Sequence, residues 1–245
     1  MTGLELGAIA AAATIGATAQ SATGFGVALP LAPVLCAVAH PPDAVLMVLV
    51  GALTHNLLVL VTRHRHLDLR RGDATVLATA GVPGLLIGAL LVTHLSKPAL
   101  QFAVGAAIAL ALALRLQAPT AKHQSWKTGT PVGFGSGVLT TTVGINGPPM
   151  VLWLRAGGAG PAQLRDTLAA VFLVLHVLAI PIVASRGAGV DPGALAALGT
   201  GLLVGHVAGM YAGARADSRR LEAALTALLV AAACASMAAG ASALL

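Results

Sequence analysis

The chain has 245 residues, of which 57% are hydrophobic and only 9% are charged, and its mean hydropathy is +0.89. Soluble domains carry about 25% charged residues, so the composition excludes an ordinary soluble protein and predicts an integral membrane protein in contact with the lipid bilayer. The net charge of +6 does not indicate nucleic-acid binding, because aromatic residues are scarce and the basic residues fall between apolar runs.

Apolar runs follow one another along the whole chain, and several reach the ~20 residues that span a bilayer as a helix. The runs cover approximately residues 3–19, 25–39, 43–62, 74–95, 98–116, 129–143, 148–156, 165–185, 192–214 and 220–244. Shorter runs, such as 25–39 and 148–156, fit either re-entrant hairpins or tilted full spans. The sequence therefore predicts an all-α polytopic membrane protein and leaves the form of the hairpins open.

The first polar interruption of this pattern is Gln20-Ser-Ala-Thr-Gly-Phe-Gly26, which Pro30 and Pro33 follow. Its glycines favour an open backbone between one helix and the next. If this interruption lies at membrane depth, it must line a cavity, because bare backbone polar groups cannot face lipid.

A second and stronger interruption is Thr140-Thr-Thr-Val-Gly-Ile-Asn-Gly-Pro-Pro149. Gly144 and Gly147 open the backbone, whereas Pro148 and Pro149 cannot continue a preceding helix but suit the first turn of a new one. The segment is typical of a helix, a polar break and a second helix. Two such breaks, one in each half of the chain, indicate a transporter.

The two halves also share a register. A shift of 121 positions aligns three kinds of residue that matter in membrane helices: glycine, histidine and arginine. The aligned pairs are Gly26 with Gly147, His55 with His176, Arg65 with Arg186, Gly84 with Gly205 and Gly88 with Gly209. This register predicts an internal duplication, with a first transmembrane repeat at 1–116, a cytoplasmic linker at 117–127 and a second repeat at 128–245.

The basic residues predict the orientation of the chain in the plasma membrane. If the loop from Arg63 to Arg71 is cytoplasmic, twelve of the fourteen Lys and Arg residues fall inside, and Lys97 and Arg186 are left outside. Both termini then lie outside. The first hairpin opens outward and the second inward, so the two repeats are predicted to be inverted copies whose hairpins meet near the midplane.

The two breaks offer the chemistry of an anion site. Helix N-termini after Gly26 and Gly147 carry a partial positive charge, and neutral side-chain donors can replace lost hydration. The alternative is that these Ser and Thr residues bond their own helix backbone. The candidate substrate-binding residues are Gln20, Ser21, Thr23, Gly24, Gly26, His55, Thr141, Thr142, Gly144, Asn146, Gly147 and His176.

His55 and His176 join this set because helical rise places each about 17 Å into a ~30 Å core. Ionisable residues near the midplane mark a pathway or a proton relay, whereas the alternative is a neutral imidazole bonded across a helix interface. No Asp or Glu falls clearly inside a span, so a carboxylate relay is not expected. Proton and sodium remain open as coupling ions, and the oligomeric state is open too.

No cofactor, no metal and no enzymatic activity are predicted, because neither His-Glu-x-x-His nor Gly-x-Ser-x-Gly occurs in the chain. A nucleotide-binding Gly-Lys-Ser/Thr loop is absent as well.

The segments Gly24-Phe-Gly26…Pro30 and Gly144-Ile-Asn-Gly-Pro148 resemble the paired motifs of the TauE/SafE sulfite-exporter family of membrane permeases, as do the two later Gly-x-x-x-Gly pairs. The resemblance implies a bacterial inner-membrane permease that moves sulfite, a sulfonate or a related small sulfur-containing organic anion by alternating access. An anion channel and a non-transporting membrane assembly subunit are the alternatives.

Overall fold

A computed structural model describes residues 1–23, 26–63, 67–116, 125–215 and 218–243 of the chain. These residues form ten α-helices and no strand. The helices are α1 (Gly3–Thr23), α2 (Ala28–Val38), α3 (Pro41–Arg63), α4 (Arg71–Val92), α5 (Lys97–Leu116), α6 (Trp126–Val143), α7 (Gly147–Ala156), α8 (Pro161–Ala184), α9 (Pro192–Arg215) and α10 (Ser218–Ser242). The predicted all-α class is confirmed.

Within the described residues, five helices are long and apolar enough to cross a membrane, namely α3, α4, α5, α8 and α9. By contrast, α2 has 11 residues and α7 has 10. At 1.5 Å per residue these two helices are only about 15 Å long, roughly half of a bilayer core. The chain is thus a multi-pass membrane protein in which each polar break precedes a half-length helix.

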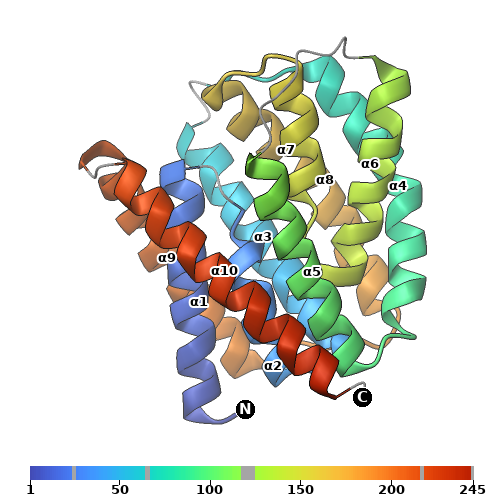
Figure 1. Ribbon diagram of the computed structural model, residues 1–245, viewed down its shortest axis with the longest axis vertical. Coiled ribbons are helices and arrows are strands. Elements are labelled where there is room, and N and C mark those ends of the chain that lie inside the picture. The colour runs from blue at the N-terminus through green and yellow to red at the C-terminus, as the bar shows by residue number, and fades with distance from the viewer. Residues whose placement is uncertain (24–25, 64–66, 117–124, 216–217, 244–245) are drawn as a thin grey trace.

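The helices pack in pairs that join the two halves of the chain (Figure 1). The helix α1 packs along α9, α4 along α6, α3 along α8, and α5 along α10. The helices α1 to α5 correspond in order to α6 to α10. When each helix is replaced by its counterpart, the α4–α6 pair becomes the α9–α1 pair, whereas the α3–α8 and α5–α10 pairs stay the same. This pattern is the one that a duplication produces, and the inverted relation of the repeats stays a prediction.

Glycine allows the closest of these approaches. A Cβ atom on Gly84 or Gly88 of α4 would overlap the backbone carbonyl of Phe134 or Val138 in α6. In the other half, Gly205 meets the carbonyl of Thr14 in the same way. Small residues let helix backbones approach closely in a membrane, where the hydrophobic effect does not drive helices together.

The described basic residues are distributed unevenly between the two ends of the bundle. Figure 1 shows the starts of α4, α6 and α8 at the end of the bundle opposite the two termini. Arg70, Arg71, Lys127, Arg155 and Arg165 belong to that distant end. Lys97 begins α5 and Arg186 follows α8, both at the end that holds the termini. The separation agrees with the predicted asymmetry, although which end faces the cytoplasm stays a prediction.

Two aspartates tie the loops at opposite ends of the bundle. Asp166 at the start of α8 accepts a hydrogen bond from the backbone N–H of Asp68 at 3.1 Å, and Asp43 at the start of α3 accepts one from Gly189 at 2.7 Å. Positions 68 and 189 are related by the same 121-residue shift. Each carboxylate therefore fastens the loop that follows the partner helix.

The predicted boundaries between repeats agree with the helix ends, since α5 ends at Leu116 and α6 begins at Trp126. Most of the predicted linker, residues 117–124, lies outside the described residues. The division into two repeats and a linker stays a prediction.

Candidate substrate cavity

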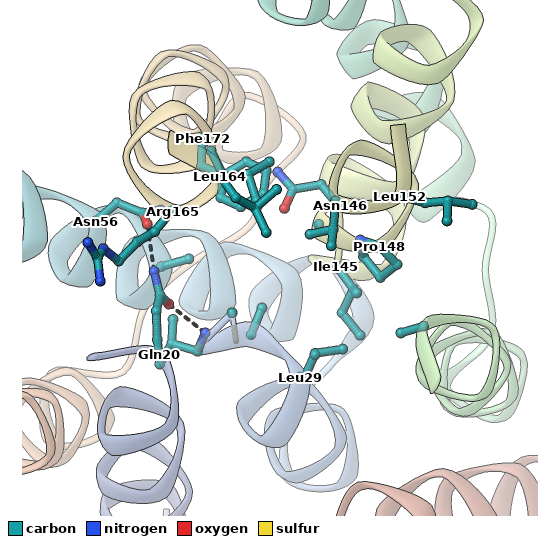
Figure 2. Close-up of a pocket in the computed structure, with 18 of the residues that line it drawn as sticks. Gln20, Leu29, Asn56, Ile145, Asn146, Pro148, Leu152, Leu164, Arg165 and Phe172 are labelled. Carbon is teal, nitrogen blue, oxygen red and sulfur yellow. Dashed lines mark hydrogen bonds between the residues drawn. The ribbon is translucent and has the colours of Figure 1, made fainter. Parts of the chain in front are cut away.

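A cavity of about 470 Å³ lies where the two polar breaks meet (Figure 2). Gly26 and Val27 of the first break line it together with Ile145, Asn146 and Gly147 of the second. Side chains from α1, α2, α3, α5, α7 and α8 complete its wall. The volume falls within the range of small-molecule sites. Both halves of the chain thus build one cavity.

A ladder of hydrogen bonds runs along one wall of the cavity. The Val27 N–H donates to Gln20 Oε1 at 2.6 Å, and Gln20 Nε2 donates to Asn56 Oδ1 at 2.8 Å. Asn56 Nδ2 lies 3.5 Å from Nδ1 of His176. Because the Asn56 oxygen is already occupied by Gln20, its amide nitrogen is the group that faces the ring. The ladder fixes the His176 Nδ1 atom as an acceptor.

The far end of the ladder points an amide at the cavity. His176 Nε2 lies 3.4 Å from the amide nitrogen of Asn146. If Nδ1 accepts, a neutral ring carries its hydrogen on Nε2, and the amide then rotates to present its oxygen to the ring; such rotations are assigned from the bonding network. The Asn146 NH₂ group then occupies the position at which Figure 2 draws the amide oxygen. The Asn146 amide is thereby left with N–H groups that do not bond to the ring, and its role toward substrate stays a prediction.

Two arginines stand toward the end of the cavity where α7 ends and α8 begins. Arg155 is exposed, and Arg165 is partly buried with its Nε 3.3 Å from Oδ1 of the fully buried Asp166. No carboxylate is among the described residues that line the cavity. The lining is otherwise mostly apolar, with Leu29, Leu152, Leu164 and Phe172 among its members. An anion with a small apolar part fits these surroundings.

The helix starts at the breaks offer fewer free donors than the sequence suggests. The Val27 N–H before α2 is already bonded to Gln20. In α7 the first turn contains Pro148 and Pro149, which have no N–H. Side-chain amides consequently supply a larger share of the polar surface than backbone groups do.

Of the predicted site residues, Gln20, Gly26, Asn146, Gly147 and His176 line the cavity. Gly147 lies against the Phe172 ring, where an added Cβ would sit 3.6 Å from Cζ. The structure thus brings the core of the predicted site together from α1, α7, α8 and the two breaks.

Other predicted residues face neighbouring helices instead. Thr141 Oγ1 donates to the carbonyl of Leu85 at 2.8 Å, and Thr142 Oγ1 donates to that of Val138 at 2.8 Å. Gly144 ends α6 with φ of 75°, and a Cβ there would meet Val48. Thr142 thus follows the alternative of bonding its own helix backbone, whereas Thr141 bonds the backbone of α4. A contact with substrate stays a prediction for Thr141, Thr142 and Gly144.

Ser21 and His55 lie outside the cavity wall and bond to each other at 3.1 Å. Gly24 lies outside the described residues, and the side chain of Thr23 is not described either. Their predicted roles remain predictions.

Among the polar and aromatic residues of the cavity wall, sequence reasoning missed Asn56, Arg155, Arg165 and Phe172. Asn56 offered a signal, because it is a polar residue next to His55 in the middle of an apolar run. The sequence analysis used Arg155 and Arg165 only to predict the orientation in the membrane, because nothing in the sequence distinguished them from the other basic residues in loops.

A helical membrane protein whose two polar breaks line one cavity inside the bundle has the architecture of a membrane transporter. Residues 8–236 match the model of the sulfite exporter TauE/SafE family, and the chain belongs to that family, whose members are transporters rather than enzymes. The resemblance read from the glycine motifs is confirmed.

A similar protein is the probable sulfite/organosulfonate exporter TauE of Cupriavidus necator, which is 29% identical over 164 residues. The match covers 63% of this chain and 62% of that relative. No solved structure matches the chain.

Proposed function

We propose that this protein carries a small oxyanion with a compact organic part, such as sulfite or a short organosulfonate, across the bacterial inner membrane. The observation that supports this most is the cavity itself: two arginines and the Asn146 amide line it, no described lining residue is acidic, and apolar side chains form most of the rest of its wall. Family membership and the name of the Cupriavidus necator relative agree with this substrate class.

The cavity is proposed to be the inward-open state of an alternating-access carrier. Its lining extends from Gln20 and His176 in the middle of the bundle to Arg155, Pro161 and Arg165 at the end rich in basic residues. If that end is cytoplasmic, as the positive-inside bias predicts, the substrate enters or leaves from the cytoplasm and both termini lie outside.

Proteoliposome flux tests this proposal directly. Purified protein should transport labelled sulfite and ethanesulfonate with saturable kinetics and counterflow, and acetate and chloride should compete weakly. A non-saturable flux without counterflow would instead indicate a channel. Absence of any anion flux from protein that remains folded would overturn the transport proposal and favour an assembly role.

Arg155 provides the sharpest test of the cavity. Arg155→Gln should raise the concentration for half-maximal flux about three- to tenfold, because a long-range charge contribution of ~1 kcal/mol corresponds to that factor. Arg71→Gln is the matched control, since Arg71 is exposed at the same end of the bundle and does not line the cavity. Equal effects of the two changes would show that the charge of the surface, and not the cavity, attracts the anion.

The proposed orientation has its own test. In a Cys234→Ala background, which removes the exposed native cysteine, Ser242→Cys should react with an impermeant thiol reagent from outside the cell. Ser125→Cys should react only from the cytoplasmic side. The reverse pattern would invert the assignment.

A further inference from the structure

Behind the cavity wall lies a second polar cluster, which consists of Ser21 on α1, His55 on α3 and His206 on α9. Ser21 Oγ is 3.1 Å from Nε2 of His55 and 3.0 Å from Nδ1 of His206. The two imidazole rings are in edge-to-face contact with centroids 5.4 Å apart. Both histidines are buried, and none of the three residues lines the cavity. We propose that this Ser21–His55–His206 cluster binds a proton that is transported together with the anion.

The Ser21 hydroxyl lies between the two rings, so the hydrogen bonds through it run in one direction, from one ring to the other. Ser21 has one hydrogen to donate, so it donates to one ring nitrogen and accepts an N–H from the other ring. One ring therefore turns a hydrogen toward Ser21 and the other turns a lone pair. The cluster has two such arrangements, which differ in the positions of the protons and not of the heavy atoms.

In each arrangement one outer ring nitrogen carries a hydrogen and the other has a free lone pair that can take a proton. His55 Nδ1 and His206 Nε2 are buried and have no hydrogen bond in the structure. A proton that binds His206 Nε2 forms a new N–H bond there. His206 Nδ1 then passes its hydrogen to Ser21 as Ser21 passes its own to His55 Nε2, and His55 releases a proton from Nδ1. The relay begins and ends with one N–H bond on each ring, and Ser21 keeps one O–H bond.

Few other charged groups face the cluster. The His206 ring is the titratable group that acts on His55, and the backbone carbonyl of Ala17 faces His55 from α1. In α1 the acidic residue is Glu5, and in α3 it is Asp43; both lie at helix starts, more than ten residues away. His176 lies beyond Asn56, and the two cavity arginines lie at the far end of the cavity. A proton on the cluster is not neutralised by a carboxylate among these groups.

An anion in the cavity supplies the missing counter-charge. Ser21 and His55 each directly adjoin a member of the cavity ladder, Gln20 and Asn56, on the same helix. Opposite charges attract strongly across a poorly hydrated interior. The proton thus favours anion binding, and by linkage the anion favours proton binding by the same factor. This coupling role rests on the proposed anion transport, whereas the proton site itself does not.

The site can be tested without substrate by ¹⁵N-histidine NMR of the purified protein, with signals assigned by His55→Gln and His206→Gln. The two rings should titrate as one coupled pair between about pH 5 and pH 8, where imidazoles titrate. Ser21→Ala should separate them into two independent titrations. Two rings that stay neutral over this range, with and without 50-fold excess ethanesulfonate, would overturn the proposal.

The coupling can be tested in proteoliposomes that contain a pH-sensitive dye, with the membrane potential clamped. Ethanesulfonate is the probe because its own charge does not change near neutral pH. An inward ethanesulfonate gradient should acidify the wild-type vesicles, and Ser21→Ala, His55→Gln and His206→Gln should each reduce acidification at least tenfold relative to labelled flux. His40→Gln and His94→Gln, at exposed positions, are the controls.

The two experiments separate the possible failures. A coupled NMR titration without ethanesulfonate flux supports the proton site and counts against the proposed substrate. Flux that needs sodium and proceeds without acidification in the wild type overturns the proton coupling and leaves anion transport intact.

Discussion

His55 and His176 occupy equivalent positions in the two predicted repeats, yet their surroundings differ. His176 faces the cavity, where Asn56 and Asn146 lie at its two ring nitrogens. His55 faces away from it and meets Ser21 and His206. The position equivalent to His206 in the first half is Leu85, and the position equivalent to Asn146 is Phe25. The predicted duplication would thus have kept the positions of the two histidines, while their neighbours changed and gave them different surroundings.

Packing between the halves is more alike than the polar networks are. Glycines of α4 face carbonyls of α6, and equivalent glycines of α9 face carbonyls of α1. Close backbone packing allows few substitutions, because any side chain must displace another backbone. Polar positions next to a cavity are less constrained by space, so the halves can diverge there and still fold alike.

The largest expected effect tests the shared packing. Gly84→Leu and Gly205→Leu should each prevent accumulation of folded protein, because the new side chain would overlap a carbonyl of the facing helix and overpacking costs several kcal/mol. Gly135→Leu is the control, since open space surrounds that glycine. The measurement is the monodisperse fraction in size-exclusion chromatography. Folding of one variant but not the other would break the equivalence of the two interfaces.

The next effect concerns the end of the cavity ladder. Asn146→Ala should weaken ethanesulfonate binding roughly ten- to hundredfold, since loss of a hydrogen bond to a charged partner costs ~1.5–3 kcal/mol. Isothermal titration calorimetry gives the affinity, and an unchanged melting temperature would show that the fold is intact. Unaltered affinity in folded protein would move the anion site away from the second break.

A smaller effect sharpens the contrast between the histidines. His176→Gln should lower ethanesulfonate affinity about three- to tenfold, because a shortened ladder orients Asn146 less well and a neutral hydrogen bond is worth ~1 kcal/mol. His55→Gln should lower it less at a fixed pH of 8. Affinity losses of equal size would mean that both histidines contact the anion. The double variant Asn146→Ala/His176→Gln should lose less than the sum of its parts, since the two residues act together.

The smallest effect is expected at the two loop ties. Asp43→Asn should reduce the free energy of unfolding by less than about 1 kcal/mol, because its bond to Gly189 is exposed and an amide oxygen can still accept it. Asp166→Asn should cost more, about 1–3 kcal/mol, since its buried carboxylate also pairs with Arg165. Thermal unfolding in detergent ranks the two. The opposite order would show that burial does not decide the strength of these ties.

The sequence alone determined the membrane class, the helices and the two breaks. These features depend on local chemistry: apolar runs must be helical in lipid, and the close grouping of Gly144, Gly147 and Pro148 favours the end of one helix and the start of the next. The 121-residue register likewise needed nothing but the positions of a few glycines and histidines. The lengths of α2 and α7 were open, because a short apolar run fits both a tilted span and a half-length helix.

Only the tertiary structure decided which polar side chains share one space. Gln20 and Ser21 are neighbours on one helix, yet one bonds to the cavity ladder and the other to His206. The same division separates Asn56 from His55. Successive residues on a helix point about 100° apart, so their roles depend on how each helix is rotated against its partners. That rotation is set by packing between distant segments, such as the glycines of α9 against α1, and no local pattern contains it.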